Sequence, residues 1–95
     1  MDNEIILKAI DHFGKESQIY KAIEEMAELT AELARLRNNR GMNVINIIEE
    51  IADVTIMAAQ LREIFGPDLV DCHIAIKLRR LNGRILDSSK VDKSR

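Results

Sequence analysis

The sequence predicts an all-α fold, a four-helix bundle-like domain that is completed by association with further copies of the chain. Apolar residues recur at helical spacing along most of the 95 residues. No two alternating apolar runs are joined by a short glycine turn, so nothing in the chain signals a β-hairpin. Small domains bury a smaller share of their surface than large ones do, which favours self-association.

Three helices are expected in the first two thirds of the chain. The range 3–13 is amphipathic, and Gly14 ends it because glycine tolerates a positive φ. Two longer helices follow over 16–37 and 44–65, and the polar stretch NNRGMN at 38–43 forms the turn between them.

A fourth helix is expected after the break Gly66-Pro67-Asp68. Proline is favoured at the first turn of a helix, so Pro67 marks its start, and its apolar residues continue to about Leu81. The range 87–95 is polar and is expected to be a frayed tail, which leaves 1–86 as the functional domain.

Composition limits the classes of partner and the compartment. The formal net charge of -2 gives no general attraction to nucleic acid or to an anionic membrane. The single cysteine, Cys72, excludes an internal disulfide and fits a reducing compartment. No stretch approaches the roughly 20 apolar residues of a membrane span, and the start MDNEIILK lacks the form of a signal peptide. We therefore expect a cytoplasmic protein that binds neither nucleic acid nor membrane.

Two similar acidic phrases, EEMAE and EEIAD, stand among apolar residues of the second and third expected helices. Positions three apart lie one turn apart on the same side of a helix, so Glu25 pairs with Glu28, and Glu50 pairs with Asp53. Bringing these two faces together would gather several like charges in a partly desolvated place, at a high cost for each unpaired ion.

Glu50 is the acid that is hardest to explain as a surface charge. A helical wheel places Val54, Met57 and Leu61 within roughly 40° of it, on a face that would otherwise be core. Glu25 lies at the edge of the apolar stripe of its own helix.

Protonation, basic partners or a metal could offset these charges. Protonating one acid does not by itself explain four acids at this spacing. Basic partners are the main alternative, because a solvated acidic face on the second helix could pair with Lys21 and Arg35. That face would consist of Glu24, Glu25, Glu28 and Glu32.

The third helix has no lysine or arginine between Val44 and Gln60 that could pair with its acids. A hard divalent cation takes oxygen ligands, and two acid pairs on facing helices can supply four of them. The spacing therefore favours Mg²⁺, with Mn²⁺ as a possible substitute.

EEMAE, 21 intervening residues and EIAD together resemble the E-E-x-x-E…E-x-x-D signature of the MazG-like all-α nucleoside triphosphate pyrophosphohydrolases. The similarity runs from about Gln18 to Leu61 and continues in a further helix that bears Lys77. The resemblance implies four magnesium ligands, which are Glu25, Glu28, Glu50 and Asp53. It also implies catalytic roles for Glu25 and for Glu24, the latter as a residue that orients water.

The resemblance further implies hydrolysis of a nucleoside triphosphate to the monophosphate and pyrophosphate, as nucleotide-pool house-cleaning by a homodimer or homotetramer. Basic residues of the fourth helix would then bind the phosphates. The candidates are Lys77, Arg80, Asn82 and Arg84. The alternative for this run is a solvated basic face at a helix C-terminus, where the helix dipole favours cations.

The sequence says least about base recognition. Only Tyr20, Phe13 or Phe65 could stack on a base, and core filling is the role that we expect for each in preference to stacking. The rival reading of the whole chain is a non-catalytic helical oligomerisation or interaction module with a structural cation site.

Overall fold

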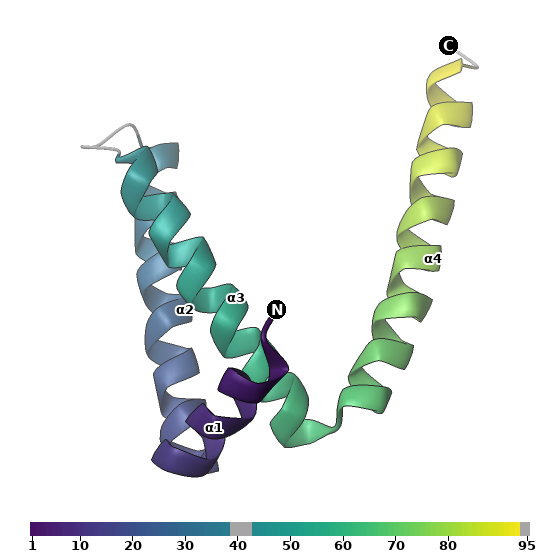
Figure 1. Cartoon of the computed structure of the whole chain (residues 1–95). Coiled ribbons are helices and arrows are strands. Elements are labelled where there is room, and N and C mark those ends of the chain that lie inside the picture. Colours follow the sequence, from purple (N-terminus) through teal and green to yellow (C-terminus); the bar gives the residue numbers. More distant parts are fainter. Residues whose placement is uncertain (39–42, 94–95) are drawn as a thin grey trace. The chain divides into compact units, whose positions relative to one another are not determined.

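The computed structural model describes the backbone of residues 1–38 and 43–93, and side chains as far as residue 89. All regular structure in this part of the chain is helical (Figure 1), so the all-α prediction is confirmed. The helices are α1 (Asn3–Phe13), α2 (Lys15–Arg37), α3 (Val44–Phe65) and α4 (Pro67–Lys93). The predicted turn at 38–43 lies mostly outside the described residues. None of the described helices combines the length and apolar character that crossing a membrane requires.

Local side-chain and backbone chemistry sets the helix starts. Asp2 caps α1, because its Oδ1 accepts hydrogen bonds from the backbone N–H groups of Glu4 at 3.0 Å and Ile5 at 3.3 Å. Asn43 does the same for α3, accepting from Ile45 N at 3.0 Å and Asn46 N at 3.3 Å.

Two glycines separate consecutive helices. Gly14, between α1 and α2, has φ 93°, and Gly66, between α3 and α4, has φ 121°. Both values lie in the region that glycine adopts without a steric penalty, so each glycine allows one helix to end and the next to begin. Pro67 opens α4 as predicted.

α4 is longer than its apolar pattern indicates. It continues past Leu81 to Lys93, so the predicted end is wrong and the range 87–93 is helical. No proline follows Leu81, and Gly83 alone weakens a helix interior by only about 1 kcal/mol. The boundary of the functional domain at residue 86 remains a prediction.

The chain forms two compact units, Met1–Phe65 and Gly66–Arg95, and α4 is the described element of the second. In the first unit, α2 and α3 lie side by side along their length and α1 packs against both (Figure 1).

The core of the first unit is small. The buried apolar residues among those described are Ile6, Ala22, Ile47 and Met57. Three polar residues are also buried, and they are Gln18, Glu25 and Gln60. A core that buries nearly as many polar as apolar side chains needs a specific explanation, since buried polar groups are costly unless they are paired.

Candidate functional site

Three acids from two helices meet where α2 packs against α3. One carboxylate oxygen from each of Glu25, Glu28 and Glu50 lies within 4.8 Å of the others. Glu25 and Glu28 come from successive turns of α2, and Glu50 faces them from α3. We call these three residues the acidic cluster, and its oxygens are close enough together to hold one cation.

Burial separates the cluster from an ordinary charged surface. Glu25 is only 8% exposed and Glu50 is partly buried, whereas Glu28 is exposed. Within the described residues, Oε2 of Glu25 and Oε2 of Glu50 are buried and have no hydrogen-bond partner. Such atoms are rare in folded proteins, because each loses its hydration without a replacement. Two of them on facing helices make this position a candidate site for a cation.

The electrostatics of Glu50 agree with this geometry. Its pKa is raised above the ordinary value of 4.5, mainly because burial disfavours the charged carboxylate. The negative charges of Glu28, Glu25 and Asp53 raise the pKa further, and so does a hydrogen bond with Glu28. A bound cation would reverse these effects, since it favours the ionised form of every ligand.

Asp53 stands apart from the other three predicted ligands. It lies one turn beyond Glu50 on α3, and its charge contributes to the raised pKa of Glu50. Its side chain is exposed, and it is not part of the acidic cluster. The structure thus brings three predicted ligands together, and coordination by Asp53 remains a prediction.

The charged-face alternative is partly realised on α2. Lys21 Nζ lies 3.3 Å from Glu25 Oε1 and 3.7 Å from Glu24 Oε2. Arg35 pairs with Glu32 at 2.7 Å. These contacts give Glu24, whose side chain is exposed, and Glu32, whose side chain is largely buried, a basic partner each. They leave Glu25 Oε2 without a partner, so they do not account for the acidic cluster.

The pairing also affects Lys21 itself. Its pKa is raised, chiefly by the hydrogen bond to Glu25, then by the charges of Glu25, Glu24 and Glu28. Lys21 therefore remains a cation beside the cluster. Its position four residues before Glu25 was the signal in the sequence, because such pairs face each other on a helix.

An open cavity of about 930 Å³ lies where α1 turns into α2, and Lys21, which lines it, pairs with Glu25 of the cluster. Lys21 and Glu24 line it on the side of the acids. The other lining residues are Phe13, Gly14, Lys15, Glu16, Ser17, Gln18, Tyr20 and Met57. We call this space the corner cavity.

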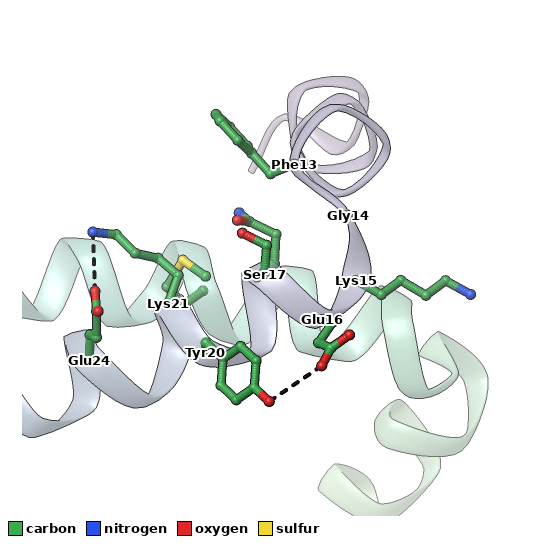
Figure 2. A pocket seen from close by; sticks show the side chains of 10 residues that line it. Phe13, Gly14, Lys15, Glu16, Ser17, Tyr20, Lys21 and Glu24 are labelled. Carbon is green, nitrogen blue, oxygen red and sulfur yellow. Dashed lines mark hydrogen bonds and ion pairs between the residues drawn. The ribbon is translucent and has the colours of Figure 1, made fainter.

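Two of the three aromatic candidates line the corner cavity. Figure 2 shows Phe13 of α1 across from Ser17 and Lys21 of α2, whereas Tyr20 points away from Phe13 toward Glu16. The Tyr20 hydroxyl donates to Glu16 Oε1 at 3.3 Å. Phe13 and Tyr20 are each 60% exposed and Phe65 is 64% exposed, so none of the three fills the core of the single chain.

A pair of buried amides, Gln18 and Gln60, joins α2 to α3 beside the corner cavity. Gln18 Nε2 donates to Gln60 Oε1 at 2.7 Å, and Gln60 Nε2 contacts Met57 Sδ at 3.5 Å. Gln18 precedes Glu25 by seven residues, and Gln60 follows Asp53 by seven. Seven residues are close to two helical turns, so this spacing was a signal that the amides share a face with the acids.

The predicted phosphate-binding residues all lie on α4. They are Lys77, Arg80, Asn82 and Arg84. Each is exposed and belongs to the unit Gly66–Arg95, whereas the acids belong to Met1–Phe65. Their contact with a phosphate remains a prediction.

The resemblance to MazG-like proteins depends on the acids of α2 and α3, three of which form the acidic cluster. No protein-family model, curated protein or solved structure matches the chain.

Proposed function

We propose that the acidic cluster binds Mg²⁺ and that the chain hydrolyses a nucleoside triphosphate to the monophosphate and pyrophosphate. One observation carries the metal site: two buried carboxylate oxygens without partners, on facing helices, belong to a cluster of three acids within 4.8 Å. Carboxylate oxygens are the ligands that hard divalent cations prefer, and the exposed side of Glu28 leaves room for water and phosphate oxygens. The motif resemblance supplies the reaction.

Within this proposal, Glu25, Glu28 and Glu50 would hold the cation, and Asp53, one turn beyond Glu50, would supply a fourth oxygen. When bound, magnesium neutralises phosphate oxygens and lowers the pKa of a coordinated water. Glu24 lies on the rim of the corner cavity with its side chain 66% exposed, where it can orient that water. Lys21 places a further positive charge between the cluster and the cavity.

The departing pyrophosphate also needs cations. Lys77, Arg80 and Arg84 are spaced at three and four residues along α4, so they share one face of that helix. Asn82 lies in the same turn and can donate from its amide. This basic face supports their assignment to the phosphates.

We also propose that the chain works as a homodimer or homotetramer, which would complete the four-helix bundle-like fold. α3 exposes Ile45, Ile48 and Ile51 at 66%, 60% and 48%, and α4 has no described helix to pack against within its own unit. Large exposed apolar surfaces in a small protein are typical of sites that contact other protein chains.

The deciding experiment measures pyrophosphate release from a panel of canonical and modified nucleoside triphosphates, with magnesium or with a chelator. We expect magnesium-dependent release by the wild type and a loss of at least about 100-fold in Glu50→Gln, because one ligand of the cluster is removed. Glu49→Gln is the matched control, since it neutralises the adjacent residue, which is exposed and outside the cluster.

The ion pairs of Lys21 and Arg35 favour a second reading, in which the chain is a helical interaction module with a structural cation. Release of pyrophosphate from none of the nucleotides, together with a magnesium-dependent rise in stability, would establish that reading instead.

A further inference from the structure

We propose that Gln18 reads the base of the substrate, accepting a hydrogen bond at Oε1 from an exocyclic amino group, and that Gln60 fixes the orientation in which it does so. This inference rests on the proposed function, because it assigns the corner cavity to the nucleoside of the same substrate. The substrate class is then nucleotides of amino-bearing bases, adenine or cytosine, in preference to their oxo counterparts.

The orientation of the amide pair follows from its contacts. A thioether sulfur accepts hydrogen bonds and cannot donate them, so Met57 Sδ requires the Nε2 of Gln60 on its side. Gln60 Oε1 then faces Gln18, which must present its own Nε2, as the 2.7 Å contact shows. The remaining group of Gln18 is its Oε1, and no hydrogen bond from the described residues occupies it. The contacts among Met57, Gln60 and Gln18 therefore leave Gln18 Oε1 open as an acceptor.

The open acceptor belongs to the cavity. Gln18 and Met57 line the corner cavity, whereas Gln60 does not, so the amide pair presents Gln18 to it. Gln18 is 7% exposed and Gln60 is 3% exposed, so the hydrogen bond between them is largely shielded from water and holds both side chains in place. An acceptor that is fixed in this way can distinguish a donor from another acceptor.

The distance to the acidic cluster suits a nucleotide. Seven residues of helix separate Gln18 from Glu25, a rise of about 10 Å along α2. Lys21 and Glu24 occupy the interval and line the same cavity. Phosphates held at the cluster would thus place the ribose beside Lys21 and the base beside Gln18.

The cavity also offers a surface for the face of a base. Phe13 lies across the cavity from Ser17 in Figure 2 and is 60% exposed. Stacking on an aromatic ring tolerates any base, because every base has a π-face. Selectivity must therefore come from the polar edge of the base, which Gln18 would face as a buried side chain.

An acceptor favours an amino group over a carbonyl at the same ring position. Adenine and cytosine present an exocyclic N–H₂ there, whereas hypoxanthine and uracil present an oxygen that would face Gln18 Oε1. Reversing Gln18 alone would satisfy the oxygen, but it would set Gln18 Oε1 against Gln60 Oε1, which are two acceptors. Reversing both amides would turn Gln60 Oε1 toward Met57 Sδ, which cannot donate to it.

The test compares two substrate pairs that differ only at this group, ATP with ITP and CTP with UTP, by kcat/KM for pyrophosphate release. We expect the wild type to favour the amino member of at least one pair by about tenfold, the effect of a neutral hydrogen bond plus an unpaired acceptor. Gln18→Met should reduce that ratio to about one. Gln60→Met should also reduce it, because Gln18 can then reverse.

Asn46→Met is the matched control, an exposed amide on α3 about 20 Å along the helix from Gln60, and it should leave the ratio unchanged. Because each ratio is taken within one variant, partial loss of folded protein cancels. Turnover with equal rates for both members of each pair, or a ratio that survives Gln18→Met, overturns the base-reading inference and leaves the proposed function standing.

If the wild type releases pyrophosphate from none of the four nucleotides, the proposed function fails, and binding of AMP and IMP in magnesium decides the inference separately. Tighter binding of AMP that Gln18→Met abolishes upholds the reading of the amino group. Equal binding, or none, overturns it.

Discussion

Replacing Glu50 with glutamine should stabilise the metal-free protein at neutral pH and at the same time remove its response to magnesium. The pKa of Glu50 is raised above 4.5 in the folded state by burial and by neighbouring acids. The folded chain therefore binds more protons than the unfolded chain between 4.5 and that raised value, so its stability falls as pH rises through this interval. Above this interval the Glu50 carboxyl destabilises the fold relative to a group that does not titrate, and a neutral amide of the same shape carries no such cost.

The magnesium response can be estimated from mass action. A ligand that binds only the folded state at ten times its Kd stabilises it by about 1.4 kcal/mol. One kcal/mol shifts the Tm of a 60–100-residue domain by about 4–8 °C, so the wild type should gain about 6–11 °C. Glu50→Gln removes an oxygen from the cluster of three, and its gain should be close to zero.

The assay is thermal unfolding followed by circular dichroism at pH 7, with a chelator or with millimolar magnesium. Glu49→Gln serves as the control for the loss of one negative charge on α3, and it should keep the wild-type response. An equal magnesium shift in Glu50→Gln and the wild type would refute the metal site. A metal-free Glu50→Gln that is less stable than the wild type would refute the electrostatic argument.

Three further predictions concern pH, the amide pair and the first turn of the chain. In the absence of metal, the stability difference between Glu50→Gln and the wild type should grow as pH rises above 4.5 and then level off. Urea unfolding at a series of pH values measures this difference. A difference that is independent of pH would contradict the raised pKa of Glu50. Met57→Leu should cost less than about 1.5 kcal/mol of unfolding free energy, because the side-chain volume is nearly kept. It should nevertheless weaken base selectivity, since Gln60 Nε2 loses the sulfur that accepts its hydrogen bond. An unchanged ratio of kcat/KM for ATP to that for ITP would show that the sulfur does not orient the amides. Gly14→Ala should destabilise the fold by about 1–2 kcal/mol through backbone strain at φ 93°. An added Cβ meets no atom within 4 Å, so a steric clash would not contribute. Urea unfolding with no change in midpoint would count against the strain.

The sequence predicts the first three helices well because their ends have local causes. Gly14 and Gly66 allow a turn that other residues adopt only with strain, and Pro67 can begin a helix but not continue one. The end of α4 was placed too early because the apolar pattern fades after Leu81 while no residue stops the helix. Loss of an apolar stripe indicates loss of a packing partner, which differs from loss of helical structure.

The candidate site could be predicted only as far as one helix at a time. The wheel identifies which acids share a face, and Glu25, Glu28 and Glu50 do meet. The rotation of α3 about its own axis relative to α2 depends on packing between the helices. The apolar pattern of one helix therefore does not predict the exposure of Asp53. The hydrogen bond between Gln18 and Gln60 was missed for the same reason, because each residue alone is an ordinary polar position.

The contact between α2 and α3 joins stability to the proposed function. A core with few buried apolar residues has little free energy to spare, yet this one holds Glu25 and Glu50 with oxygens that no described residue satisfies. Selection for stability alone would replace such groups, since neutral or apolar residues of similar volume would fit the same space. Carboxylates that destabilise the empty fold are expected where a cation converts their mutual repulsion into attraction. The predicted opposition between metal-free stability and magnesium binding in Glu50→Gln is therefore the behaviour that separates a metal centre from a charged helix face.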